Sequence, residues 1–149
     1  MAAELGLGGT QRGLVSFATR LDRERFSPRV ITLAGGGPRE GTLRAAGVPV
    51  VTGCSGEQTL AHELEGSDVV HVFRHGIAEP LVPAAARRAQ VPVLIEGNIF
   101  GARDRSADEP QFACHLFISM MCLLRYRRGA GGDANFAARH RVLYLPIEG

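Results

Sequence analysis

The residues with the clearest chemical use lie near the front of the chain, in the segment 6–12 (GLGGTQR). Glycines lack a Cβ atom and let the backbone approach a ligand closely, and the free N–H groups at a helix start favour an anion such as a phosphate. Thr10 stands where an N-cap residue belongs, because its hydroxyl can accept a hydrogen bond from the first turn. The spacing is neither G-x-G-x-x-G nor a Walker loop, which needs a lysine. A plain tight turn explains the loop equally well.

Other candidate residues follow predicted strands. Imidazole groups in general titrate near neutrality, so His75 could orient or deprotonate a substrate hydroxyl. Glu96 and Asn98 carry groups that hydrogen-bond hydroxyls, although each could equally cap its own loop. We expect Ser119 to act first as a helix cap and second as a substrate contact. Arg12, one turn into the first helix, could pair with a phosphate or be a solvated surface residue.

The elements that must position these residues alternate along the chain. Apolar residues at i, i+3, i+4 and i+7 predict a helix over about residues 10–25. Short apolar runs predict strands at 29–34, 48–52, 68–73, 91–95, 114–118 and 141–145. Between them we expect helices at about 39–46, 57–65, 77–90 and 119–128, a helical turn at 134–140, and a long loop at 96–110. His71 lies between two valines of a strand, which favours a packing role.

Strands of about five residues, apolar on both faces and separated by helices, are typical of a parallel sheet. We therefore predict a single α/β domain, a Rossmann-like doubly wound sheet in three layers, α/β/α. Residues 1–5 (MAAEL) would supply a first strand that is short or truncated. Ligands of such folds bind beyond the carboxyl ends of the strands, so the candidate residues should line one edge of the sheet.

Composition excludes several function classes. The chain has 149 residues, 17 basic residues that are all arginine, and a formal net charge of +2, so neither lysine chemistry nor generic nucleic-acid binding is expected. Its 3 cysteines fit neither a disulfide framework nor a zinc site, which suggests reduced thiols and a cytoplasmic protein. We expect no metal ion and no membrane span. A truncated first strand would expose apolar sheet surface, which would favour a homodimer.

Several segments follow one another in a recognisable order, beginning with the loop GLGGTQR, a helix ending in Leu-Asp-Arg at 21–23 and the strand 30–33 (VITL). These segments resemble the front of family-four glycosyltransferases with the GT-B fold. The segments 43–50 (LRAAGVPV), 68–75 (DVVHVFRH) and 91–98 (VPVLIEGN) fit further motifs in register. Residues 119–128 and 141–149 (RVLYLPIEG) are similar to its last helix and to its link between domains.

The resemblance implies that residues 1–149 form an acceptor-binding domain, half of an enzyme whose donor-binding C-terminal domain is absent. Such an enzyme transfers a sugar from a nucleotide-sugar, its co-substrate, to a sugar or lipid-linked acceptor, with retention of configuration and no metal or other cofactor. Gly8, Gly9, Thr10 and Arg12 would face the donor phosphates, and Asn98 and Ser119 would bind substrate. His75 and Glu96 would serve catalysis. The histidine that many relatives carry near position 96 is missing here, so Glu96 or Asn98 would hydrogen-bond a sugar hydroxyl in its place. Contact with a membrane would be peripheral at most.

Two rival functions remain open. A stand-alone module could hold a sugar or phosphate in the same half-cleft without catalysis. A dinucleotide-binding oxidoreductase is less well supported, because the glycine spacing differs and no acidic residue ends the second strand, where Leu33-Ala34-Gly35 stands.

Overall fold

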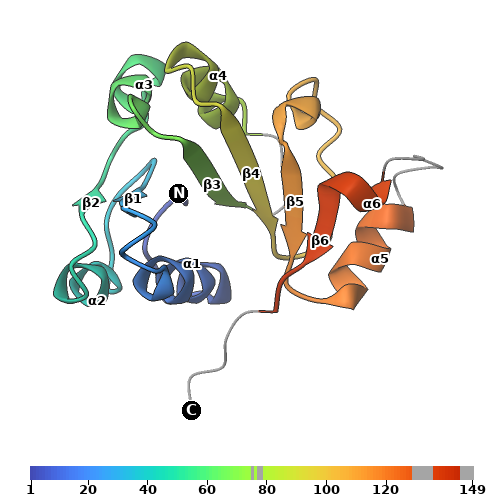
Figure 1. Ribbon diagram of the computed structural model, residues 1–149, viewed down its shortest axis with the longest axis horizontal. Helices are drawn as coiled ribbons and strands as arrows, with labels where there is room; N and C mark the ends of the chain where they lie inside the picture. Colours follow the sequence, from blue (N-terminus) through green and yellow to red (C-terminus); the bar gives the residue numbers. More distant parts are fainter. Residues whose placement is uncertain (75, 77–78, 129–135, 145–149) are drawn as a thin grey trace.

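The structure is a computed structural model that describes residues 1–74, 76, 79–128 and 136–144. Helices and strands alternate along the chain (Figure 1). The strands are β1 (Val30–Ile31), β2 (Val50–Val51), β3 (Val69–Arg74), β4 (Val93–Asn98), β5 (Cys114–Phe117) and β6 (His140–Val142). The helices are α1 (Gly9–Arg20), α2 (Glu40–Ala45), α3 (Glu57–Leu64), α4 (Leu81–Arg88), the 3-10 turn η1 (Glu109–Gln111), α5 (Met120–Arg128) and α6 (Phe136–Arg139).

The described strands pair in parallel, β1 with β2 and β3 through β6 in the order β3-β4-β5-β6. The leading segment, residues 1–3, joins these two groups. The Phe73 N–H donates to the Met1 carbonyl at 2.9 Å, and the Leu33 N–H donates to the Ala2 carbonyl at 3.2 Å. The full order is therefore β2, β1, leading segment, β3, β4, β5, β6, which is the doubly wound arrangement. The prediction of a Rossmann-like α/β domain with a short first strand is confirmed.

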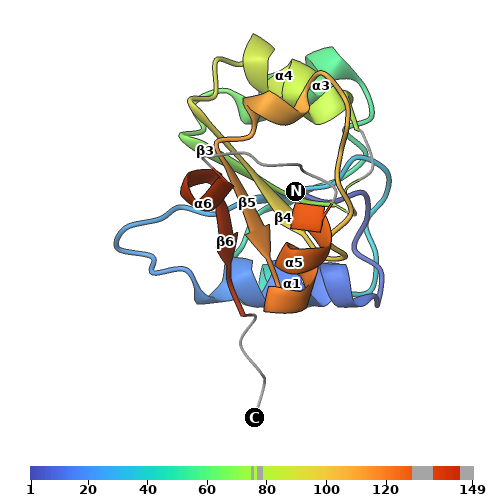
Figure 2. The same cartoon turned by 90° about the vertical axis from the view of Figure 1, so that its right-hand side faces the viewer.

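Helices cover both faces of the sheet, as the three-layer prediction requires. One apolar cluster lies between the strands and the helices α3 and α4, and a second lies between the strands and α1 and α2. In Figure 1, α3 and α4 lie at the top and α1 and α2 at the bottom, and the view turned by 90° keeps α3, α4 and α1 in these places (Figure 2). No helix in the described ranges is long and apolar enough to cross a membrane.

The observed ends of helices α1 and α4 differ from the predicted ones at three places. Helix α1 begins at Gly9 with Gly8 as its N-cap, so the predicted cap Thr10 is wrong: it lies inside the helix and is buried. The same helix ends at Arg20, because the Asp22 side chain accepts the Glu24 N–H at 3.0 Å and forms a turn. Helix α4 begins at Leu81, which places Pro83 in its first turn, where a missing N–H costs nothing.

The strand bounds also differ from the predicted ones, since β1 and β2 hold 2 residues each where strands at 29–34 and 48–52 are expected. Strand β4 continues to Asn98, three residues further than expected, and carries Glu96 into the sheet. Ser119 caps α5 as predicted, since its Oγ accepts the Cys122 N–H at 3.2 Å. The predicted packing role of His71 is confirmed, because its ring lies 5.1 Å from the Phe17 ring and 4.3 Å from the Phe73 ring.

Candidate functional site

The site begins with a row of polar side chains across the carboxyl half of the sheet. The parallel register places Glu96 of β4 opposite His115 of β5, and His115 opposite His140 of β6. Paired residues of neighbouring strands project to the same face, and so do residues two positions along. Arg74 and Asn98, themselves a registered pair, therefore stand beside this row on the same face.

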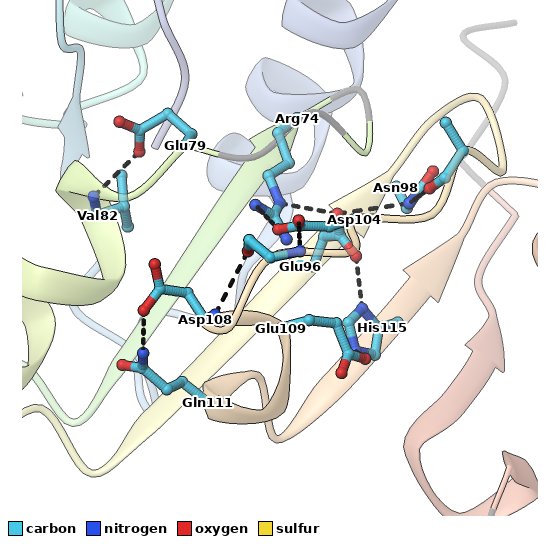
Figure 3. Close-up of polar contacts among 12 residues, drawn as sticks. Arg74, Glu79, Val82, Glu96, Asn98, Asp104, Asp108, Glu109, Gln111 and His115 are labelled. Carbon is cyan, nitrogen blue, oxygen red and sulfur yellow. Dashed lines mark hydrogen bonds and ion pairs between the residues drawn. The ribbon is translucent and has the colours of Figure 1, made fainter. Parts of the chain in front are cut away.

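Arg74 is the cationic centre of the row. Its Nε lies 2.8 Å from Glu96 Oε1, its Nη1 lies 2.9 Å from Asp104 Oδ2, and its guanidinium carbon lies 4.3 Å from the centre of the Phe112 ring. All three charged side chains are buried. The two carboxylates and the aromatic face replace the water that the cation loses on burial. Figure 3 shows Arg74, Glu96 and Asp104 converging.

Asn98 fixes the chain that follows β4. Its Nδ2 donates to the Ala102 carbonyl at 2.7 Å, and its Oδ1 accepts the Gly101 N–H at 2.8 Å. These bonds turn the loop so that Asp104 meets Arg74. Burial opposes ionisation of Asp104, but hydrogen bonds from the Ser106 backbone and side chain and the nearby Arg74 charge leave its pKa below the usual range. The loop therefore contributes a charged group to the site.

His115 extends the network towards β6. Its Nδ1 lies 2.5 Å from Glu96 Oε2, and its Nε2 lies 3.0 Å from Glu109 Oε1. The neighbouring His140 ring is nearly parallel to it, with ring centres 4.9 Å apart. Burial lowers the pKa of His140, although its bond to the Phe136 carbonyl acts in the opposite direction. The row therefore ends in two adjacent imidazoles with a carboxylate on either side of His115.

The glycine loop lies at the point where the order of the strands reverses. It follows the leading segment, which pairs with β1 on one side and with β3 on the other. Helix α1 starts here without a side-chain cap, and a Cβ atom built on Gly9 would meet nothing within 4 Å. Arg39 donates to the Gly6 and Leu7 carbonyls, each at 3.1 Å, and so holds the loop. Unused N–H groups at such a point favour an anionic ligand.

The structure brings some predicted site residues together and separates others. Glu96 and Asn98 share the buried network, with Asn98 Nδ2 3.4 Å from Glu96 Oε1. Both Glu96 oxygens already have protein partners, so this carboxylate is a structural member of the network as it stands. The Gly8–Arg12 segment lies at the start of α1, and Ser119 at the start of α5. His75 lies outside the described residues. Roles in binding or catalysis for these residues stay predictions.

Several members of the network were not predicted from the sequence, namely Arg74, Asp104, Glu109, His115 and His140. One signal was present: His115 is a polar residue inside an otherwise apolar strand, with the same facing as Phe117. Asp104 and Glu109 carry no such signal, because they lie in a loop and a short turn without periodicity.

A surface hollow elsewhere on the protein lies between the ends of α3 and α4 and is lined by Gln58, His62, Glu65, Arg88 and Gln90, among others. These helix ends lead into the amino ends of β3 and β4, so the hollow is at the opposite edge from the site. Comparisons with protein-family models, with curated proteins and with solved structures found no match to this chain. Any functional conclusion must therefore come from the site itself.

Proposed function

We propose that this chain is the acceptor-binding domain of a glycosyltransferase resembling family four, which transfers a sugar from a nucleotide-sugar to an acceptor hydroxyl with retention of configuration. The observation that carries the proposal is the uncapped glycine loop at the strand-order reversal, next to the carboxyl end of β3. A departing nucleoside diphosphate gains negative charge, which N–H groups at this position would stabilise. The free thiols of the 3 cysteines accord with a cytoplasmic protein.

Exposed apolar side chains support a partner domain at the same edge. Phe100 follows β4, and Met120, Met121 and Leu124 lie on the helix that follows β5, each about half exposed or more. The two segments touch, because Cys122 Sγ lies 3.2 Å from the Ile99 carbonyl. A donor-binding domain packed over the carboxyl ends of the strands would cover this surface. The nucleotide-sugar would then lie between the two domains.

A binding module without catalysis is the second candidate, and the burial of Glu96 favours it. This carboxylate is 0% exposed and paired with Arg74 and His115, so it cannot reach a substrate hydroxyl in this conformation. A general base must come within hydrogen-bond reach of the proton that it removes.

Amide NMR titration of the whole chain tests the proposal. Nucleoside diphosphates, nucleotide-sugars and simple sugars are added in turn, and we expect shifts at Gly8, Gly9 and Thr10. Gly9→Asp places a negative charge in the loop where the space is open, and should abolish the shifts caused by phosphates. Gly41→Asp, in a helix turn with equally open space, should leave them unchanged.

Two outcomes separate the candidates. If the polypeptide from the complete reading frame transfers sugar to an acceptor, the enzyme is supported; if it binds without transfer, the module is supported. If no nucleotide or sugar shifts the loop amides, both are wrong. Shifts with NADH alone would instead favour an oxidoreductase.

A further inference from the structure

Three potential ligand atoms for a metal ion converge at the β5–β6 side of the sheet. They belong to Glu109 in η1, His115 in β5 and His140 in β6, and all lie within 4.8 Å of one another. The two histidines are brought together by strand register, and Glu109 by the turn that leads into β5. His115 is fully buried, His140 is 6% exposed and Glu109 is partly buried.

The Nδ1 atoms of both imidazoles already have protein partners. His140 Nδ1 lies 2.6 Å from the Phe136 carbonyl, which can only accept a hydrogen bond, so this nitrogen carries the proton. His115 Nδ1 lies 2.5 Å from the Glu96 carboxylate. These contacts direct the Nε2 lone pairs of both rings inwards, the arrangement that carboxylate and carbonyl groups impose on metal-binding histidines.

The Nε2 atoms of both imidazoles lack hydrogen-bond partners among the described residues. Neither His115 Nε2 nor His140 Nε2 has a hydrogen bond with acceptable geometry to any described residue, although both are buried. Glu109 Oε1 lies 3.0 Å from His115 Nε2, but the angles of this contact are not those of a hydrogen bond. Buried polar atoms normally find a partner, and a role in binding an ion is one recognised reason why they do not.

We propose that His115 Nε2, His140 Nε2 and the Glu109 carboxylate bind one divalent transition-metal ion, with zinc the best fit to two imidazoles and a carboxylate. Zinc–ligand bonds of about 2.1 Å in a tetrahedron separate the ligand atoms by about 3.4 Å. Here His115 Nε2 and Glu109 Oε1 lie 3.0 Å apart, and the three ligand atoms all lie within 4.8 Å of one another. Three protein ligands leave a fourth position for water or an external ligand. The site is separate from the glycine loop and does not depend on the proposed transfer activity.

Binding of the ion requires one imidazole ring to turn and Glu109 to change its contacts. The imidazole planes are within 9° of parallel, so one ring has to turn for both lone pairs to meet a single ion. Glu109 Oε1 also lies 3.6 Å from Arg139 Nη2 and 3.4 Å from the Tyr126 hydroxyl, so a carboxylate that binds the ion through Oε1 must shift these two contacts to its other oxygen. Glu96 would act as a positioning residue, because it holds His115 without touching the ion.

Calorimetric titration of the chelator-treated chain with Zn²⁺ tests the site, with Co²⁺ absorption as a second measurement. We expect one ion per chain and visible Co²⁺ bands of tetrahedral intensity. His140→Ala should weaken zinc binding at least about 100-fold, and Glu96→Gln about 10–100-fold. His62→Ala, which removes an exposed histidine 3.4 Å from Glu65, is the control and should bind zinc like the parent chain.

Glu109→Gln guards against loss of fold, because this side chain lies at the partly exposed rim and the amide preserves its size. It should weaken binding at least about 10-fold while circular dichroism stays unchanged. Imidazole nitrogen spectra should show that Zn²⁺ shifts Nε2 of two histidines. Absence of stoichiometric binding, or equal affinity in the parent chain and His140→Ala, would overturn the proposal.

Discussion

The Arg74 guanidinium lies 2.8 Å from the Glu96 carboxylate, and both side chains are buried. Asp104 lies on the other side of the same guanidinium. Removing one partner of a buried ion pair leaves the other without water or a counter-charge. We expect Arg74→Met to lower the free energy of unfolding by about 3–5 kcal/mol, measured by urea denaturation.

An exposed pair provides the control. Arg44 contacts Glu40 at 2.7 Å, one turn apart on α2, with more than half of the Arg44 side chain exposed. Arg44→Met should cost less than about 1 kcal/mol. Equal losses in the two variants would show that Arg74 is hydrated in solution.

Gly97 faces the other side of the sheet, towards His71. A Cβ atom at Gly97 would lie 2.9 Å from His71 Nε2 and 3.2 Å from a Phe73 ring carbon. The His71 ring cannot move aside easily, because it is packed against Phe17 and Phe73. We expect Gly97→Ala to cost about 1–3 kcal/mol in urea denaturation. Gly41→Ala, in α2 with open space around it, should instead stabilise by about 0.5–1 kcal/mol.

His71 should make stability depend on pH. Burial lowers its pKa to about 3 from an ordinary value of 6.5. Between these values the unfolded chain binds a proton that the folded chain does not, so stability falls as pH falls from 6.5 towards 3. The expected slope from this group is on the order of 1 kcal/mol per pH unit.

A non-titrating variant isolates this effect. His71→Phe keeps an aromatic ring in the cluster and should lose less stability between pH 7 and pH 4.5, by urea midpoints at each pH. Asp104 and the other carboxylates titrate in both proteins and cancel in the difference. An identical pH dependence in the two proteins would mean that His71 is accessible to protons in the folded state.

Asn98 should control the loop between β4 and η1. Asn98→Ala removes both side-chain bonds to Gly101 and Ala102, so the loop should open more often. We expect faster trypsin cleavage after Arg103 or Arg105, both exposed, than after Arg20. Gln58→Ala, an exposed amide on α3, is the control. Cleavage that is equally fast at every arginine would indicate global unfolding instead.

Two helix ends form a natural matched pair. Helix α2 is followed by Gly47 at φ +71° and α4 by Gln90 at φ 54°, and each leads into the sequence Val-Pro-Val. The two helix ends also share the same backbone hydrogen bond: the Val48 N–H donates to the Leu43 carbonyl at 2.9 Å, and the Val91 N–H donates to the Ala86 carbonyl at 2.9 Å.

Left-handed backbone costs an L-residue about 1–2 kcal/mol, and glycine avoids most of this cost. Gln90→Gly should therefore raise the thermal midpoint, and Gly47→Gln should lower it. The two shifts should be similar in size, as measured by scanning calorimetry. Midpoints that move in the same direction would contradict this account.

The layered parallel sheet could be predicted because apolar strands of about five residues alternate with amphipathic helices. The ends of the elements were less predictable, because local hydrogen bonds decide them. The Asp22 turn stops α1 early, and the N-cap falls on Gly8, since the helix begins one residue before Thr10.

The site was predictable only at positions directly after strands. Glu96 and Asn98 were found in this way, whereas their buried partners depend on register between distant segments. His115 meets His140 across 25 positions of sequence, and Arg74 meets Asp104 through the course of a loop. Pairings of this kind are set by strand alignment, which residue spacing does not reveal.

The leading segment also limits the order of folding. Residues 1–3 lie between β1 and β3, so their place in the sheet is complete only when residues 71–73 are available to pair with them. During synthesis on the ribosome, residues 1–3 stay unpaired on one side until β3 has left the exit tunnel. A chain stalled before β3 would therefore present an open sheet edge, a natural target for chaperones.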